Sequence, residues 1–275
     1  MTTPDTARPI GVFDSGIGGL TVVRALMHRL PYENIVYFGD TARVPYGSKS
    51  PEVVRAYAAD DMKFLLEHDV KMVVVACNTV TAVAMDVVQK IARRPVVGVI
   101  VPGAQAAAAA TTKKRVGVIG TYATVHSNSY TNALRQIDPA IQTFPQPCPL
   151  FVPLAEEGWV DHEVTRLVAR EYLFPLTLHK IDTLILGCTH YPVLREAILS
   201  VVGPSIALID SGEATAGEVE RILDSTGLRN ASQDRPNLRF FVSDIPSKFT
   251  EVGERFLGTS MGRVRLSHAM GEKAL

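Results

Sequence analysis

The chain has 275 residues, of which 47% are apolar and 20% are charged, and its 28 Lys and Arg balance 28 Asp and Glu. This length and composition are typical of a globular protein with one large domain or two of ordinary size. Because the formal net charge is zero and no run of basic residues occurs, charge alone draws the chain neither to nucleic acid nor to an acidic membrane.

The sequence also indicates a compartment. Its three cysteines are an odd number for a disulfide framework, which a chain of this length does not need. Residues 1–10 lack the apolar core of a signal peptide. The most apolar region, residues 96–110, is broken by Pro102 and Gly103 and is too short to span a bilayer. We therefore expect a soluble cytoplasmic protein with no nucleic-acid or membrane partner.

In the first part of the chain, short apolar runs alternate with helical patterns. We expect strands at residues 10–13, 35–38, 72–76, 96–99 and 116–119, helices at 20–30 and 51–68, and an alanine-rich helix between the last two strands. Ser50 and Pro51 are typical of the cap and the first residue of a helix. Residues 72–76 carry no polar side chain, which favours a strand buried on both faces, as in a parallel sheet.

The second part continues the alternation. We expect a helix at 128–137, a proline-dense loop at 139–153 that holds Cys148, a helix at 161–173, strands at 183–186, 206–209 and 238–242, and helices at 214–224 and 248–256. Strands that alternate with helices predict right-handed crossovers and parallel sheets.

Two pairs of stretches resemble each other at a nearly fixed offset. MVVVACNTVTAVA at 72–84 is echoed by LILGCTHYPVL at 184–194, with cysteines 111 positions apart, and the glycine-bearing strand ends at 11–19 and 117–125 lie 106 apart. Such repetition predicts a duplicated architecture. We expect an α/β fold of two similar lobes with mainly parallel sheets flanked by helices, pseudo-symmetric, formed by residues 1–98 plus 210–275 and by residues 99–209. The active site would lie in the interlobe cleft, beyond the carboxyl ends of the strands.

The glycine turn GIGG at residues 16–19 follows the first strand and opens a helix. Converging backbone N–H groups make such a turn a natural anion site. The turn is not the six-residue dinucleotide fingerprint, and no acidic residue clearly follows a strand at the required distance, so we do not expect a nucleotide.

Cys77 and Cys188 each follow an apolar strand and precede a helical pattern. Each could be a small core residue. A helix N-terminus favours the thiolate, however, which makes each cysteine a candidate acid or base near neutral pH.

Three chemistries would use these residues. Cys188 could be a nucleophile with His190 as its base, which leaves Cys77 without a role. The same three side chains could bind a metal, but their spacing is not that of a zinc site and no fourth ligand is evident, so we expect none. Alternatively, both thiols could act on opposite faces of a planar intermediate. One would remove a proton from a stereogenic carbon and the other would return one, which racemises the substrate.

The motifs DSGIGG, GDTARVPYG, ACNTVTA and LGCTHYP occur in this order between Asp14 and Pro192. Together they resemble the glutamate racemases, a cofactor-independent branch of the aspartate/glutamate racemase superfamily. CTHYP and the VPYG loop point to the glutamate branch, since aspartate racemases usually carry a glutamate where His190 stands. The resemblance implies interconversion of L- and D-glutamate without pyridoxal phosphate, metal or nucleotide, with D-glutamate supplying peptidoglycan and hence the cell wall and cell shape.

The resemblance also implies roles for single residues. Cys77 would deprotonate the D-substrate and Cys188 the L-substrate, with Asp14 beside the first cysteine and His190 beside the second. An imidazolium stabilises a thiolate, whereas a carboxylate disfavours one. The substrate-binding residues would be Asp14, Ser15, Tyr46, Gly47, Asn78, Thr79, Thr189 and His190. Most of these could also be helix caps or structural hydrogen bonders.

Further contacts are expected from Thr121, Thr124 and one of Glu156 and Glu157, between which the sequence does not choose. We expect Cys148 to be structural, Trp159 to be core, and Arg43 and Lys49 to face solvent. The alternatives left open are a racemase or isomerase of the same superfamily that acts on aspartate or another small diacid, a cysteine hydrolase, and a binding protein without catalysis. The family also makes a homodimer possible.

Overall fold

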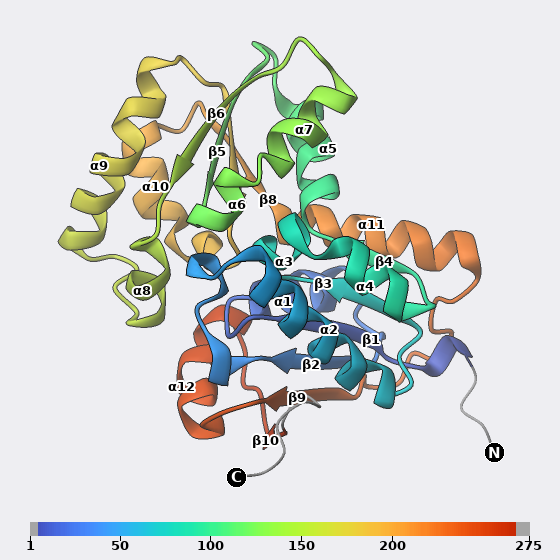
Figure 1. Cartoon of the computed structure of the whole chain (residues 1–275). Coiled ribbons are helices and arrows are strands. Elements are labelled where there is room, and N and C mark those ends of the chain that lie inside the picture. Colours follow the sequence, from blue (N-terminus) through green and yellow to red (C-terminus); the bar gives the residue numbers. More distant parts are fainter. Residues whose placement is uncertain (1–4, 268–275) are drawn as a thin grey trace.

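The computed structural model describes residues 5–267, which form two all-parallel sheets flanked by helices (Figure 1). The six-stranded sheet has the order β10-β9-β2-β1-β3-β4, and the four-stranded sheet has the order β6-β5-β7-β8. The predicted fold class is therefore confirmed. The strands are β1 Ile10–Asp14, β2 Ile35–Gly39, β3 Met72–Val75, β4 Val96–Gly98, β5 Arg115–Gly120, β6 Gln142–Pro147, β7 Thr183–Gly187, β8 Ala207–Asp210, β9 Leu238–Val242 and β10 Val264–Leu266.

The helices lie on both faces of the sheets (Figure 1). Every residue of β1, β2, β3 and β7 is buried, as expected for strands covered on both faces. The helices are α1 Leu20–Arg29, α2 Pro51–Glu67, α3 Asn78–Val83, α4 Met85–Ala92, α5 Ile100–Ala110, α6 Tyr122–His126, α7 Ser129–Ile137, α8 Phe151–Glu156, α9 Glu163–Leu178, α10 Arg195–Val202, α11 Ser211–Thr226 and α12 Pro246–Leu257, with short 3₁₀ turns at Asp5–Ala7, Thr41–Arg43, Tyr46–Ser48 and Tyr191–Leu194.

The strand order repeats between the two sheets. β2-β1-β3-β4 in the larger sheet corresponds to β6-β5-β7-β8 in the smaller one, and β9 and β10 extend the larger sheet beyond β2. In both units the chain starts on one strand, adds the next strand on one side of it and then crosses to add the third and fourth strands on its other side. This matched order agrees with the duplicated architecture that the paired sequence stretches predicted.

The two sheets draw on different parts of the chain. The larger sheet joins strands within residues 10–98 to strands within 238–266, whereas the smaller sheet uses residues 115–210. α11 packs against α1 and also against α5. We continue to propose lobes made of residues 1–98 plus 210–275 and of 99–209, of which 1–4 and 268–275 lie outside the described residues.

The proline-dense segment at 139–153 is where the sequence prediction was wrong, because it forms β6 and the start of α8 rather than a loop. β6 is an edge strand that pairs only with β5. Pro145 and Pro147 are two residues apart, so the N–H groups they lack fall on the same side of the strand. An edge strand tolerates this because one of its sides has no partner. The short edge strand β10 was also not predicted.

Local signals explain the other elements. Ser50 caps α2, and its hydroxyl accepts from the backbone N–H of Val53 at 3.5 Å, with Pro51 as the first helical residue. α9 starts at Glu163 and continues to Leu178 with Pro175 inside it, beyond the predicted end. Between residues 5 and 267, no helix is long and apolar enough to cross a membrane.

Candidate active site

The carboxyl ends of the inner strands of both sheets meet at one cavity. β1 leads into Ser15, β3 into Cys77, β5 into Thr121 and β7 into Cys188. Cys77 and Cys188 both line this cavity, and each is almost fully buried. Of the other predicted site residues, the cavity is lined by Ser15, Tyr46, Gly47, Asn78, Thr79, Thr121, Glu156, Thr189 and His190.

Cys77 stands at the cap position of α3, with its Sγ 3.6 Å from the hydroxyl of Ser15. Burial raises the pKa of the Cys77 thiol to about 12, and the charge of Asp14 adds to this. The thiol is therefore the resting form. This differs from the sequence expectation of a thiolate, because burial and a carboxylate outweigh the effect of a helix N-terminus.

Asp14 lies behind the glycine turn and not in the cavity lining. Its Oδ2 accepts from the backbone N–H groups of Gly16 at 3.1 Å and Gly19 at 3.0 Å. Its Oδ1 is buried and has no hydrogen-bond partner within residues 5–267. Burial raises the pKa of this carboxyl despite those bonds and the nearby charge of His190. Asp14 thus caps the turn and influences Cys77 by charge, while its catalytic and substrate-binding roles remain predictions.

His190 links Cys188 to a carboxylate. Its Nδ1 lies 3.8 Å from the Sγ of Cys188, and its Nε2 lies 2.9 Å from Oε1 of Glu156. Burial works against the charged imidazole, but the contacts with Cys188 and Glu156 outweigh it and raise the pKa of His190 to about 10. Burial likewise opposes the charge of Glu156, yet the bond to His190 lowers the pKa of that carboxyl. The geometry therefore selects Glu156 over Glu157 as the acidic neighbour.

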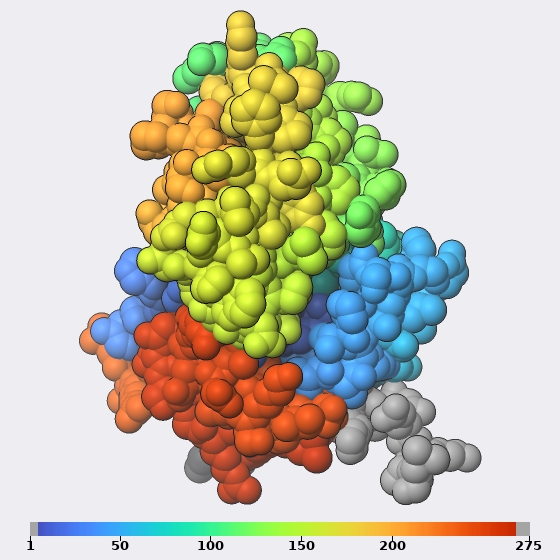
Figure 2. Space-filling view, turned by 90° about the vertical axis from the view of Figure 1, so that its left-hand side faces the viewer, coloured from blue at the N-terminus to red at the C-terminus, as the bar shows by residue number. Residues whose placement is uncertain are grey.

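α12, which packs against β9 and β10 of the larger sheet, supports this arrangement. Arg255 donates to the backbone oxygen of Glu156 at 3.2 Å, and the ring of Phe256 meets the His190 ring edge-on at 5.3 Å. In Figure 2 the α8 region, in yellow-green, lies against α12, in red. Glu156, whose carboxylate stabilises the protonated His190, is thus held between α8 and α12.

The glycine turn serves this contact between the lobes. A Cβ on Gly18 would lie 2.3 Å from Oγ1 of Thr189 and 2.4 Å from Nδ1 of His190. Thr21 donates its hydroxyl to the backbone oxygen of Thr189 at 2.9 Å. Only glycine lets the turn approach the Cys188 loop so closely.

Three threonine hydroxyls form a second contact across the cleft. Oγ1 of Thr79, in α3, lies 3.1 Å from that of Thr121 and 3.4 Å from that of Thr124, and the latter two are 3.1 Å apart. Thr121 also caps α6 by accepting from the backbone N–H of Thr124 at 3.3 Å. Thr79 and Thr121 line the cavity, whereas Thr124 stands behind them.

The VPYG loop is held by buried charges. The hydroxyl of Tyr46 bonds to Asp40 and lies 3.1 Å from Asp61. Arg43 pairs with Asp40 at 2.5 Å and with Asp61 at 2.9 Å. The prediction that Arg43 faces solvent was wrong, because its side chain is only 19% exposed. A Cβ on Gly47 would lie 2.7 Å from Cβ of Thr121, so this loop also approaches the second lobe closely.

The remaining predicted residues lie outside the cavity lining. Cys148 is fully buried and its thiol bonds to the backbone oxygen of Gln146, as a structural residue would. Trp159 is 43% exposed and stacks on His162, so its prediction as core was wrong. Lys49 is partly exposed. All three cysteines are free thiols.

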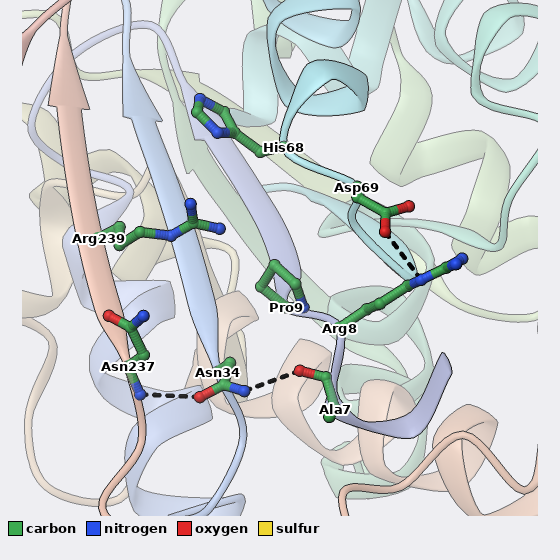
Figure 3. A pocket seen from close by; sticks show the side chains of 8 residues that line it. All are labelled: Ala7, Arg8, Pro9, Asn34, His68, Asp69, Asn237 and Arg239. Carbon is green, nitrogen blue, oxygen red and sulfur yellow. Dashed lines mark hydrogen bonds and ion pairs between the residues drawn. The ribbon is translucent and has the colours of Figure 1, made fainter. Parts of the chain in front are cut away.

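A second cavity, of about 310 Å³, opens at the amino-terminal ends of β1, β2 and β9, opposite the ends that carry the cysteines (Figure 3). It is lined by Arg8, Asn34, His68, Asp69 and Arg239, among others, and Arg8 lies 2.9 Å from Asp69. It contains no cysteine and no group close to the cysteine cavity. We therefore assign the candidate active site to the cavity with the two cysteines.

Comparison with known proteins gives one family by three routes. Residues 20–219 match the family model described as Asp/Glu/Hydantoin racemase. The glutamate racemase of Chlorobaculum tepidum is 54% identical over 259 residues, which are 94% of this chain and 95% of that protein. The solved glutamate racemase of Francisella tularensis, in complex with D-glutamate, matches with a TM-score of 0.91 and 44% identity over 96% of this chain and 99% of that chain. A glutamate racemase isoform of Bacillus anthracis matches with a TM-score of 0.92 and 39% identity over 96% and 98%.

Proposed function

This chain belongs to the Asp/Glu/hydantoin racemase family, among the glutamate racemases, and from that premise we propose that it interconverts L- and D-glutamate with Cys77 and Cys188 as its two acid/base groups. It is accordingly an isomerase, and its family implies that D-glutamate supplies peptidoglycan. The observation that carries the two-thiol mechanism is that both cysteines, one from each sheet, line the same cavity.

In the direction from L to D, the thiolate of Cys188 removes the α-proton. The C–H bond breaks, the proton passes to the sulfur, and the electron pair is delocalised onto the α-carboxylate. The thiol of Cys77 then gives its proton to the opposite face, which leaves Cys188 as a thiol and Cys77 as a thiolate. The reverse reaction runs the same steps backwards, so atoms and charges balance in either direction.

The surroundings of the two cysteines suit this direction. Burial keeps Cys77 protonated, with a pKa of about 12, so it is ready to donate. His190 is an imidazolium 3.8 Å from the Cys188 sulfur, and a nearby positive charge favours a thiolate. In the direction from L to D, Cys77 is thus suited to donate the proton, and His190 supplies the positive charge beside the accepting sulfur.

Neutral donors from both lobes would hold the substrate. Ser15, Asn78, Thr79, Thr121 and Thr189 offer hydroxyl and amide groups around the cavity. Donors directed at the α-carboxylate stabilise the charge that develops as the α-proton leaves. The hydroxyl of Tyr46 bonds to buried carboxylates, so we propose that this loop contributes through its backbone.

The variants Cys77→Ala and Cys188→Ala test the mechanism. We expect racemisation of each enantiomer to fall by about 10³-fold or more in both variants, because each lacks one acid/base group. Polarimetry and incorporation of solvent deuterium at the α-carbon provide the readouts. Cys148→Ala, which removes a buried thiol outside the cavity, is the matched control and should racemise glutamate normally. Racemisation at near wild-type rate in either test variant would contradict two essential thiols.

Substrate choice has its own test. We expect turnover of glutamate and little turnover of aspartate, since the three similar proteins named above are glutamate racemases. Preference for aspartate would overturn the substrate and keep the two-thiol chemistry. A covalent intermediate on Cys188, with full activity after Cys77→Ala, would instead indicate a hydrolase.

We further propose that the protein works in the cytoplasm and assembles as a homodimer. The three free thiols support a reducing compartment. Analytical ultracentrifugation measures the assembly, and a monomer at micromolar concentration would exclude a stable dimer.

A further inference from the structure

Asn78, the residue after Cys77, contacts a tyrosine of the other sheet's helices. The hydroxyl of Tyr130, in α7, donates to Oδ1 of Asn78 at 2.7 Å. Both side chains are buried, and Asn78 lines the active-site cavity. The contact therefore joins a residue beside the reacting sulfur to a helix that packs on the smaller sheet.

Two glycines leave room for the Tyr130 ring. A Cβ on Gly103, in α5, would lie 3.3 Å from Cε1 of this ring, and a Cβ on Gly187, at the end of β7, would lie 3.1 Å from its Cε2. Both distances are shorter than ordinary van der Waals contact. The ring thus occupies a slot that larger residues would narrow, and its hydroxyl is fixed in position.

A third group completes the contact. The Tyr130 hydroxyl oxygen lies 2.7 Å from Oγ of Ser211, the first residue of α11. The Ser211 hydroxyl also lies 3.3 Å from the backbone oxygen of Leu186, but its contact with Tyr130 is the shorter one. Since Tyr130 gives its one hydrogen to Asn78, Ser211 supplies the hydrogen between the two hydroxyls. Burial raises the pKa of Tyr130, so the phenol keeps its hydrogen at neutral pH. Tyr130 is therefore a permanent donor to Asn78.

We propose that Tyr130 is a positioning residue for substrate binding: by holding Oδ1 of Asn78, it directs the amide nitrogen of Asn78 into the cavity as a donor to a substrate carboxylate. This inference rests on the proposed function and assigns to it a residue that does not line the cavity. An amide that could turn freely would present its oxygen to the carboxylate for part of the time, which repels it.

A double-mutant cycle tests the proposal. Tyr130→Phe removes the hydroxyl and leaves the ring in its slot. We expect KM for both enantiomers to rise on the order of tenfold, with kcat within about twofold, because a hydrogen bond to a charged group is weakened. In an Asn78→Ala background the same substitution should change KM by less than about twofold, because no amide is left to position.

Tyr172→Phe serves as the control. The Tyr172 hydroxyl accepts from the backbone N–H of Leu150 at 3.4 Å, away from the cavity, so wild-type kinetics are expected. Ser211→Ala is a second route if Tyr130→Phe folds poorly. It removes the hydrogen supplied to Tyr130, and we expect a rise in KM of about threefold that also disappears without Asn78.

Two results would overturn the proposal. One is a wild-type KM in Tyr130→Phe or, where that variant does not fold, in Ser211→Ala. The other is an equal loss with and without Asn78, which would indicate a purely structural tyrosine. Wild-type racemisation reports on the proposed function, whereas the coupling between the two positions reports on Tyr130, so the two failures are distinguishable.

Discussion

The two cysteine sites match in architecture and differ in electrostatics. Each cysteine follows the third strand of a repeated unit, at the carboxyl end of β3 or β7. On one side, burial and the charge of Asp14 raise the pKa of Cys77. On the other, Cys188 lies beside the imidazolium of His190, which is paired with Glu156. The repeated strand order therefore places the two sulfurs in equivalent positions, and their neighbours differ: a carboxylate lies near Cys77 and an imidazolium near Cys188.

Unequal sides are compatible with a reaction between mirror images. L- and D-glutamate have equal free energy in water, so kcat/KM must be the same from either enantiomer, in the wild type and in any variant. Unlike neighbours suit the two sulfurs to different roles in one direction, in which one accepts a proton while the other donates one. The asymmetry is therefore visible in thiol reactivity, in pH profiles and in kcat and KM taken separately.

Among substitutions that keep both cysteines, the largest expected effect comes from separating the glycine turn from the Cys188 side. In Gly18→Ala the new methyl would lie 2.3 Å from Thr189 and 2.4 Å from His190, so these residues must move. We expect kcat/KM to fall by about 100-fold in both directions, since small displacements of reacting groups are costly. In the control Gly217→Ala, in α11, the nearest atom would be at 3.6 Å, and we expect normal kinetics with stability raised by about 0.5–1 kcal/mol. Activity of Gly18→Ala within threefold of wild type would contradict the close packing of the glycine turn against Thr189 and His190.

The rates at which the two thiols are alkylated test directly whether the surroundings of Cys77 and Cys188 differ. A Cys77 pKa of about 12, against the usual 9, leaves little thiolate at pH 8. Allowing for the greater nucleophilicity of a more basic sulfur, we expect iodoacetamide to modify Cys77 roughly 50-fold more slowly than an ordinary thiol. Cys188 should react faster than Cys77, and mass spectrometry of the peptides gives both rates. Equal rates would mean that the different neighbours of Cys77 and Cys188 do not change the reactivity of the two thiols.

Removing Glu156, the acidic partner of His190, should lower the pKa of His190 and so make the surroundings of the two cysteines more alike. The pKa of His190, about 10, is raised by its contacts with Cys188 and Glu156, so Glu156→Gln lowers it. The imidazolium then loses its proton at a lower pH, and the alkaline limb of the plot of kcat/KM against pH shifts to lower pH. We expect a loss on the order of tenfold at pH 9.5 and a smaller one at pH 7. Glu157→Gln is the matched control and should leave the alkaline limb unchanged. An unchanged limb in Glu156→Gln would mean that the Glu156 carboxylate does not raise the pKa of His190.

The sequence predicted most of the fold, because hydrophobic runs and helix caps act locally. β9 was predicted residue for residue, and the paired stretches around Cys77 and Cys188 predicted a duplication, with which the matched strand order agrees. β6 was missed because its prolines are read as breakers, and only the sheet order reveals that the strand lies at an edge.

The site was predictable where a motif carries a side chain and less so where packing decides. Cys77, Cys188 and His190 meet at the cavity as expected. The choice of Glu156 over Glu157 depends on the direction in which each side chain leaves the last turn of α8. Two identical residues in a row do not show that direction in the sequence. Tyr130 gave no signal, since its partner Asn78 lies 52 positions away.

The smallest effect is expected from Asp14, the group that distinguishes the Cys77 side. Asp14→Asn removes a charge that raises the pKa of Cys77, so alkylation of Cys77 at pH 8 should accelerate by about threefold to tenfold, while burial still keeps that pKa above its usual value.

The same substitution should alter stability with a defined sign. Burial raises the pKa of the Asp14 carboxyl above its usual 3.8, so the folded protein holds this proton more tightly than the unfolded chain. Its stabilising contribution is present below pH 3.8 and is lost as pH rises through the folded pKa. Asparagine keeps an oxygen for the N–H groups of Gly16 and Gly19 and cannot ionise. Urea unfolding should therefore show an advantage for Asp14→Asn that is larger at pH 8 than at pH 4. An advantage that shrinks with pH would mean that Asp14 is stabilised as a carboxylate, and the contrast between the two cysteine sites would then need another source.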